Sequence, residues 1–426
     1  MCSKNSFFLI LFFLLILQAD KAQIHTINLS GKWDFQIDSL DQGISEKWFN
    51  ISLTDRINLP GSMLTNNKGD EVTINTKWTG IEDSNFYKSP DFVKYRQPGN
   101  VKFPFWLQPL KYYVGVAWYK KKVIIPANWG RRFTELFLER CHWETTLWVD
   151  DKKVGMQNAL SAPHIYELSK WLTPGMHTIS IRIDNRIKDI DPGKAASSIT
   201  DNTQTNWNGM IGKMILINHP AVYISDVQLY PDVDKKIVKA VVTVSNLTNK
   251  EMEYELSLMV FAKYVTNGIK PLTKRIKLNK DTTVIEWEYP MGDRFSLWDE
   301  FNPNVYTLNA TLKGDLGIDT KATDFGMRKF EIKGTQFVMN GRTIFLRGTL
   351  ECAIFPKTGY PSVSEKDWER IYRKCREYGL NHIRFHSWCP PEAAFIAADK
   401  MGIYLSNRKF SLGFSWRWKS HRQICL

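Results

Sequence analysis

A short polar and aromatic stretch near the end of the chain carries residue types that bind sugars or metals. It reads NHIRFHSW over residues 381–388, and its alternation of polar and apolar residues predicts a β-strand. Side chains alternate between the two faces of a strand, so three polar side chains should share one face and two apolar side chains the other. The polar ones are His382, Arg384 and His386, and the apolar ones are Ile383 and Phe385.

Two readings of this polar face are open, a ligand site and an interior polar network. A metal site built on His382 and His386 is weakly supported, because no carboxylate stands at ligand spacing. In a β/α barrel the apolar face would meet the helix layer, and binding groups gather at the C-terminal ends of the strands. That position favours Arg384, His386 and Trp388 over His382 as binding residues.

The segments around this strand predict alternating strands and helices. SVSEKDWERIYRKCREYG, residues 362–379, has apolar residues at helical spacing, a capping-box-like start at Ser364 and Asp367, and a stop at Gly379. PPEAAFIAADKMG predicts a second helix, with strands expected at TIFLRGT before the first helix and at IYL after the second. Strand-helix-strand-helix-strand is the opening of a parallel α/β fold.

The preceding three hundred residues read as short strands and turns. GKWDFQID and HTISIRIDNR alternate apolar and polar residues, which predicts a jelly-roll type β-sandwich over residues 23–220. KIVKAVVTVSN and VYTLNATLKG continue the alternation in a second all-β unit, residues 221–329. Its size fits an immunoglobulin-like sandwich. The expected fold is therefore multidomain and mainly β.

Residues 1–22 predict a secretory signal peptide. FFLILFFLLIL, residues 7–17, is unbroken apolar sequence behind Lys4, and it is too short to cross a bilayer core of roughly 30 Å as a helix. The alternative is an uncleaved anchor. We expect a secreted or periplasmic protein without stable membrane insertion.

Charge and cysteine content limit the partners. The formal net charge is +13, but the lysines are scattered along alternating strands, which argues against a nucleic-acid surface. Four cysteines lie between the leader and the last residues without a CxxC pair, so neither a zinc site nor a disulfide framework is expected. No metal ligands and no cofactor are predicted, and metal dependence stays open.

Seven collinear segments resemble glycoside hydrolase family 2, which includes β-galactosidases, β-glucuronidases and β-mannosidases. In chain order they are LPGSM (59–63), GVAWYKKKVIIP (115–126), LWVDDKKVG (147–155), NWNGMIGKMIL (206–216), LWDEFNPNVYTL (297–308), DFGMRKFEIKGTQFVMNGRTIFLRGT (324–349) and the stretch around residue 384. The resemblance implies a sugar-binding type sandwich, an immunoglobulin-like unit and a TIM barrel, of which residues 330–405 would be the first two β/α units.

The resemblance also implies site residues and chemistry. Family members are retaining enzymes with two glutamates, both on later barrel strands, so no catalytic residue is expected in this chain. The expected substrate is a β-glycoside, with a β-galactosidase-like activity. The family's Asn and His after the first barrel strand are here Leu350 and Cys352, which leaves the sugar open. The expected substrate-binding residues are Arg384, His386, Trp388, Arg347, Asn206 and Trp207, with core packing as the alternative for Trp207.

The last residues, 406–426, depart from this pattern. They contain five Lys or Arg residues and no acid, without strand or helix periodicity. An aberrant basic tail from an out-of-frame translation is one interpretation, and a real short tail is the other. We expect the chain as written to be inactive alone, and its parent to be a glycosidase. The alternative is a non-catalytic secreted carbohydrate-binding or scaffold protein.

Overall fold

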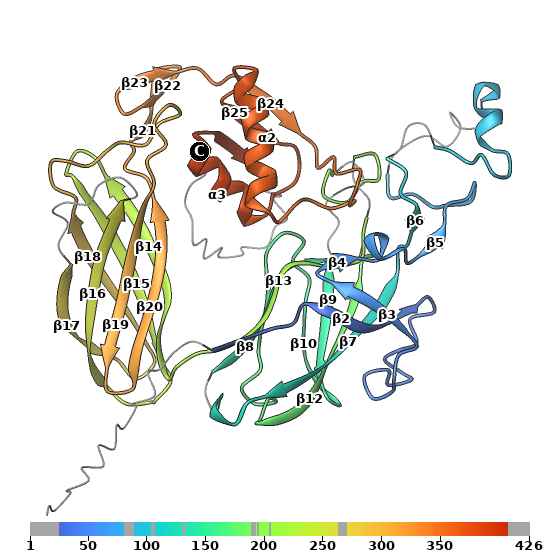
Figure 1. Cartoon of the computed structure of the whole chain (residues 1–426), viewed down its shortest axis with the longest axis horizontal. Coiled ribbons are helices and arrows are strands. Elements are labelled where there is room, and N and C mark those ends of the chain that lie inside the picture. Colours follow the sequence, from blue (N-terminus) through green and yellow to red (C-terminus); the bar gives the residue numbers. More distant parts are fainter. Residues whose placement is uncertain are drawn as a thin grey trace, which may run out of the picture.

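The computed structural model describes residues 25–80, 89–103, 107–129, 133–188, 193, 196–203, 206–262 and 271–407. Figure 1 shows three bodies, of which two are rich in strands and the third combines a small sheet with helices. This arrangement confirms the expected multidomain, mainly β architecture. The expected signal peptide, and the expected tail apart from Ser406 and Asn407, lie outside the described residues. No helix among the described residues is long and apolar enough to cross a membrane.

The first body is a β-sandwich of two antiparallel sheets, with short elements beside it. One sheet has the order β1 (His25–Asn28), β13 (Gly209–Asn218), β8 (Thr134–His142), β11 (His164–Glu167), with β4 (Gly61–Ser62) also paired to β13. The other has the order β10 (Lys152–Gln157), β9 (Glu144–Val149), β12 (Gly175–Asp184), β7 (Val116–Ile125), β2 (Gly31–Asp38), β3 (Asp55–Leu59). The short elements are η1 (Leu64–Asn66), β5 (Asp70–Glu71), η2 (Pro90–Tyr95), β6 (Lys111–Tyr112) and η3 (Ala127–Trp129).

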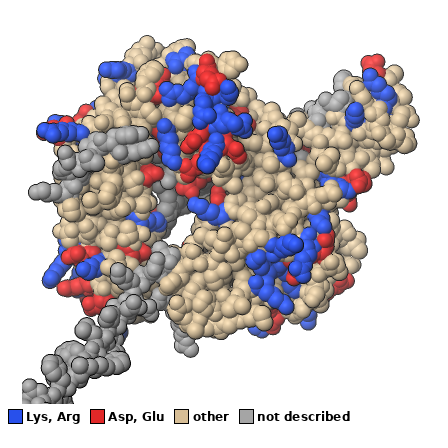
Figure 2. Space-filling model, in the orientation of Figure 1, with Lys and Arg blue, Asp and Glu red and all other residues tan. Residues whose placement is uncertain are grey.

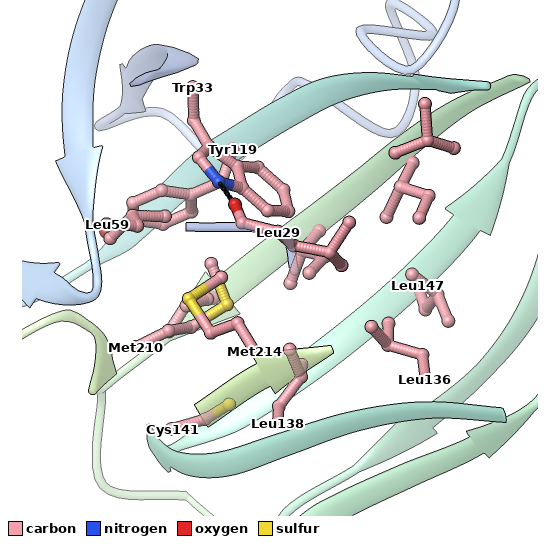
Figure 3. Packing of buried hydrophobic residues seen from close by; sticks show 14 of the residues in the cluster. Leu29, Trp33, Leu59, Tyr119, Leu136, Leu138, Cys141, Leu147, Met210 and Met214 are labelled. Carbon is pink, nitrogen blue, oxygen red and sulfur yellow. Dashed lines mark hydrogen bonds between the residues drawn. The ribbon is translucent and has the colours of Figure 1, made fainter. Parts of the chain in front are cut away.

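The core of the sandwich lies between these two sheets. Trp33 and Phe35 alternate along β2 and are each 1% exposed, as the sequence pattern predicts. Figure 3 shows Trp33 and Tyr119 of one sheet above Leu136 and Leu138 of the other. The Trp33 indole N–H donates to the Leu29 carbonyl at 2.9 Å, so its polar atom is satisfied inside the core.

The second body is a seven-stranded sandwich with three strands facing four, as in immunoglobulin-type folds. The sheets have the orders β14 (Val222–Asp232), β15 (Ile237–Asn246), β18 (Thr282–Pro290) and β17 (Leu272–Leu278), β16 (Met252–Ala262), β19 (Tyr306–Gly314), β20 (Gly317–Phe325). Every second residue of β15 and β19 enters the shared core. A small antiparallel sheet follows, made of β21 (Phe330–Lys333), β22 (Gln336–Met339) and β23 (Arg342–Ile344).

The third body is a β/α unit in which strands and helices alternate as expected. Its elements are β24 (Gly348–Glu351), α2 (Glu365–Glu377), β25 (His382–Phe385), α3 (Glu392–Met401) and β26 (Tyr404–Asn407). The three strands are parallel, in the order β24-β25-β26. Gly379 and Gly402 follow the helices with φ angles of 73° and 67°, conformations that favour glycine at a helix end.

The predicted capping box of α2 does not form. Ser364 is the N-cap residue but makes no side-chain cap hydrogen bond. The carboxylate of Asp367 instead accepts a hydrogen bond from the Ser362 hydroxyl at 2.6 Å. The Ser362 hydroxyl also accepts the Ser364 backbone N–H at 3.1 Å, so it replaces the Asp367 carboxylate that would accept this N–H in a capping box.

The helices cover one face of the parallel sheet. Ile383 and Phe385 are buried on that face, and the Phe385 ring meets Trp368 of α2 at 5.9 Å in an edge-on contact. Arg384 points away from this core and is exposed, as the alternation predicts. Parallel sheets are ordinarily covered on both faces, and the described residues supply helices for only one.

The second body is joined to the β/α unit around Glu300. This carboxylate is 7% exposed and accepts hydrogen bonds from Arg347 at 3.2 Å and from the Asn381 amide at 2.6 Å. The Trp298 indole N–H donates to the Asp399 carbonyl at 2.8 Å. Both contacts lie at the N-terminal end of the parallel strands, since Arg347 precedes β24 and Asn381 precedes β25.

We expect Glu300→Ala to destabilise the chain by about 2–3 kcal/mol, because the change leaves the buried Asn381 amide and Arg347 without their shared acceptor. Urea unfolding followed by tryptophan fluorescence measures the effect. Glu286→Ala, which removes an exposed ion pair with Lys239, is the matched control and should leave the midpoint unchanged. Equal midpoints for the two variants would show that Glu300 contributes nothing at this junction.

Candidate functional site

The candidate site begins where β25 ends. The strand stops at Phe385, and Ser387 follows with a φ angle of +52°, so the chain turns there. His386 therefore lies one residue beyond the end of the strand, directly before this turn. Its backbone N–H donates to the Glu351 carbonyl at 2.8 Å, which holds it at the C-terminal end of β24.

A loop of the first sandwich contacts this turn. The Ser197 backbone N–H donates to the Ser387 hydroxyl at 3.4 Å, and the Ser197 hydroxyl lies 3.4 Å from the Nδ1 atom of His386. Ser387 also hydrogen-bonds the same ring nitrogen, at 3.0 Å. His386 is half-buried, so the imidazole is held by hydroxyls from both bodies while part of it stays accessible.

Trp207 forms a second contact between the sandwich and the β/α unit. Its ring stacks on His142 with centroids 4.6 Å apart, and it meets the Tyr360 ring of the loop after β24 at 5.5 Å. Trp207 is 4% exposed. The indole is thus buried between the sandwich and the β/α unit, as the core-packing alternative expects, and its role toward a substrate stays a prediction.

Asn206 belongs to a buried polar network beneath Trp207. Its amide oxygen is 2.9 Å from the Nε2 atom of His142, and its amide nitrogen donates to the Asn185 carbonyl at 3.0 Å. Its backbone N–H donates to the Asp201 carboxylate at 3.0 Å. These bonds occupy both ends of the side chain, so Asn206 fixes the loop that presents Trp207.

Asp201 is the centre of that network. Its Oδ2 atom accepts the Thr79 backbone N–H at 2.6 Å and the Tyr112 hydroxyl at 2.8 Å. Burial raises the pKa of Asp201 to about 7, although the hydrogen bonds from Tyr112, Thr79 and Asn206 act in the opposite direction. Burial also lowers the pKa of His142 to about 3, so this ring is neutral near pH 7.

Arg384 and His382 occupy the uncovered face of the parallel sheet. Arg384 is exposed and makes no hydrogen bond or ion pair with the described residues. His382 is half-buried, with Nε2 3.1 Å from the Ser406 hydroxyl. Burial lowers the pKa of His382, and the charge of Arg384 lowers it further. A guanidinium with unused donors beside a neutral imidazole can bind hydroxyl or carboxylate groups.

Trp388 and Arg347 are not brought to this position. Trp388 is 2% exposed, and its ring packs edge-on against Phe385 at 5.2 Å within the core of the β/α unit. Arg347 lies at the opposite, N-terminal end of β24, where it bonds Glu300 and the Gly379 carbonyl. Of the six predicted residues, the structure shows contacts between the sandwich and the β/α unit for His386 and Trp207. Asn206 lies beneath Trp207, and Arg384 lies on the uncovered face of the parallel sheet.

Glu351 is a titratable group at the C-terminal end of the parallel sheet. It is the last residue of β24. Its carboxylate accepts hydrogen bonds from the backbone N–H groups of Ala353, at 2.9 Å, and Ile354, at 3.3 Å. Burial raises the pKa of Glu351 to about 6, and the two amide donors offset part of that rise.

Sequence reasoning also missed His142, Ser197 and Tyr360. Each reaches the site from a segment whose local pattern is that of an ordinary strand or loop, so the sequence held no signal for them. Among the residues that the structure describes, no group of three or more His, Cys, Asp or Glu side chains is placed to hold a metal ion.

Comparisons with known proteins show which family this chain resembles. The model of glycosyl hydrolases family 2 matches residues 222–328, the seven-stranded sandwich. A β-galactosidase of Priestia megaterium is 20% identical over 402 residues, which cover 90% of this chain and 36% of that protein. The chain is thus similar to glycosyl hydrolases family 2, as its sequence motifs indicate.

Solved structures share the fold of this chain. A β-glucuronidase of Bacteroides uniformis superposes with a TM-score of 0.68 at 18% identity, over 90% of this chain and 42% of that one. A β-glucuronidase of Ruminococcus gnavus superposes with a TM-score of 0.63 at 15% identity, over 92% of this chain and 60% of that one. The chain spans about a third of the length of the curated relatives it matches.

Proposed function

We propose that this chain supplies the sugar-contacting domains of an exported β-glycosidase, and that the whole protein hydrolyses β-galactosides or β-glucuronides with retention of configuration. Relatives named β-galactosidase and β-glucuronidase support the substrate class. The observation that carries the proposal is the contact of Ser197 with His386 and Ser387, because it joins the sandwich to the C-terminal ends of parallel strands. In β/α barrels that end holds the binding groups.

The uncovered face of β24, β25 and β26 supports an assignment to the opening of a TIM barrel. Arg384 and Leu350 are exposed on that face, and a parallel sheet with one bare face exposes apolar surface to water. Additional β/α units would cover it and turn Arg384 toward a barrel interior. In that setting Arg384 would donate hydrogen bonds to sugar hydroxyls, and His386 would accept or donate one.

The described carboxylates of the β/α unit support the proposal that this chain does not hydrolyse glycosides by itself. Retaining hydrolysis needs an acid and a nucleophile whose carboxyl groups are roughly 5–5.5 Å apart. Of the five glutamates after β23, four lie on helices: Glu365, Glu369, Glu377 and Glu392. The fifth, Glu351, has its carboxylate engaged by two backbone amides of its own loop.

Release of nitrophenol from β-galactoside, β-glucuronide and β-mannoside substrates tests this proposal. We expect no turnover above buffer by the 426-residue chain, and turnover by a polypeptide in which the chain is continued with further β/α units encoded by the same gene. Turnover by the 426-residue chain alone would refute the proposal that the catalytic acid and nucleophile are not among its residues. Binding without turnover in every version would favour a non-catalytic carbohydrate-binding protein.

Arg384→Ala is expected to weaken β-glycoside binding at least about tenfold, because a charge-assisted hydrogen bond contributes roughly 1.5–3 kcal/mol. Since Arg384 is exposed and has no described partner, the melting temperature should stay unchanged. Calorimetric titration measures the affinity. Arg370→Ala, an exposed arginine on α2, is the matched control and should bind as the wild type does. An unchanged affinity in the Arg384 variant would remove this residue from the site.

A further inference from the structure

Arg140 of β8 is a buried cation without a carboxylate partner among the described residues. It is 5% exposed, and its Nη2 atom donates to two backbone carbonyls, Ser161 at 3.4 Å and Cys389 at 2.5 Å. It forms no ion pair with the carboxylates that the structure describes. The adjacent Glu139 forms no ion pair with Arg140, and its carboxylate accepts the Lys213 backbone N–H at 2.7 Å.

The two carbonyls belong to different bodies. Ser161 lies in the sandwich between β10 and β11, whereas Cys389 lies in the loop between β25 and α3. A buried guanidinium costs several kcal/mol of desolvation, and burial lowers the pKa of Arg140 accordingly. Two carbonyl dipoles offset that cost only while both stay in place. The cation therefore holds the loop of Cys389 at a fixed distance from the sandwich.

The loop that Arg140 holds is the one that carries the candidate site residues. Residues 386–391 begin with His386 and Ser387, and both of these contact Ser197 of the sandwich. The hydrogen bonds of Ser197 are long, at 3.4 Å, whereas that of Arg140 is short and charge-assisted. Arg140 thus makes the stronger of the two attachments between this loop and the sandwich. The weaker hydrogen bonds of Ser197 depend on the loop position that Arg140 sets.

We propose that Arg140 is a positioning residue that fixes residues 386–391 against the sandwich and thereby orients His386 and Ser387 for the β-glycoside. The orientation of the loop follows from the contacts above, and the role toward a sugar rests on the proposed function. The first sandwich is then a structural part of the site, because loss of one of its side chains frees the His386 imidazole.

The test compares Arg140→Met, which keeps the bulk of the stem, with Arg140→Lys, which keeps the charge and one possible carbonyl contact. The signal of the His386 Cε1–H group is followed by NMR without sugar, and His386→Gln identifies it. We expect a shifted and broadened His386 signal in the methionine variant and a smaller change in the lysine variant. The signal of His177, whose ring is held by Asp150 in the sandwich, should not move.

Arg56→Met is the matched control, since this arginine is exposed and pairs only with Asp34 at 3.2 Å. It should leave the His386 signal unchanged. An unaltered His386 signal in both Arg140 variants, or an equal disturbance of His177 and His386, would overturn the proposal.

A second arm measures the affinity for methyl β-galactoside and methyl β-glucuronide. We expect the methionine variant to bind at least about threefold more weakly, and the lysine variant to recover part of the loss. A disturbed His386 signal without any sugar binding, in the wild type or the variants, would refute the proposed function and leave the positioning role of Arg140 intact.

Discussion

Asp201→Asn is expected to be less stable than the wild type by about 1–3 kcal/mol at about pH 4, and the difference should shift by about 4 kcal/mol in favour of the variant by pH 7.5. Burial raises the pKa of Asp201 from 3.8 to about 7 in the folded chain. The folded state therefore favours the protonated carboxyl. Its stabilising contribution is fully present below pH 3.8 and is lost as the pH rises through about 7.

The geometry of Asp201 explains why asparagine is a poor replacement. A protonated carboxyl can donate to Tyr112 while the same oxygen accepts the Thr79 N–H. If the amide nitrogen of asparagine takes the place of Oδ2, it cannot accept the Thr79 N–H. If the amide is flipped, the nitrogen takes the place of Oδ1 and faces the Asn206 N–H, which it cannot accept either. Either orientation leaves one buried donor unsatisfied, which costs about 1–3 kcal/mol.

Urea unfolding of the wild type and Asp201→Asn across this pH range measures the difference directly. Taking the difference cancels the titration of other groups, including His142, whose lowered pKa acts in the opposite direction. Asp293→Asn is the control, because Asp293 is exposed and its hydrogen bond with Lys236 lowers its pKa. The control difference should stay constant above about pH 5. Parallel stability curves for the wild type and Asp201→Asn would contradict the assignment.

Trp207→Ala should lower the free energy of unfolding by about 3–5 kcal/mol, the usual cost of removing a large buried aromatic ring. The indole loses its stacking on His142 and its contact with Tyr360, so the boundary between the sandwich and the β/α unit should loosen as well. Equilibrium unfolding gives the first effect. Limited proteolysis of the loop between β24 and α2 gives the second.

Trp207→Phe is the matched variant, because it retains an aromatic ring against His142 at smaller volume. It should recover more than half of the lost stability and restore protection of the loop. A boundary that is protected equally in Trp207→Ala and the wild type would mean that this ring acts only within the sandwich.

Periodicity alone predicted most of the fold. The alternation in β2, β15 and β19 gave the buried faces of both sandwiches, and the spacing of apolar residues in α2 gave the helix that covers Phe385. These features follow from burial along a single element. The capping box at Ser364 failed because the competing Ser362 hydroxyl lies five residues from Asp367, outside the local motif.

The candidate site was predictable only where its residues share one strand or one loop. Arg384 could be placed from alternation, but the hydroxyl groups of Ser197 and Ser387 that hold the His386 ring could not. Trp388 stands close to these residues in the sequence, yet its ring enters the core. Arg347 precedes the neighbouring strand, but it bonds Glu300 at the far end of β24. Contacts such as Ser197 with His386 join residues 189 positions apart, and no local pattern records them.

The most direct test of a sugar site between the sandwich and the β/α unit is fluorine NMR of the 426-residue chain labelled with 5-fluorotryptophan. Trp207→Phe identifies the Trp207 resonance, and Trp33→Phe identifies that of Trp33 in the distant sandwich core. Titration with methyl β-galactoside or methyl β-glucuronide should shift the Trp207 resonance to saturation and leave Trp33 in place. A Trp207 resonance that does not move with either sugar, or that moves no more than Trp33, would contradict the account.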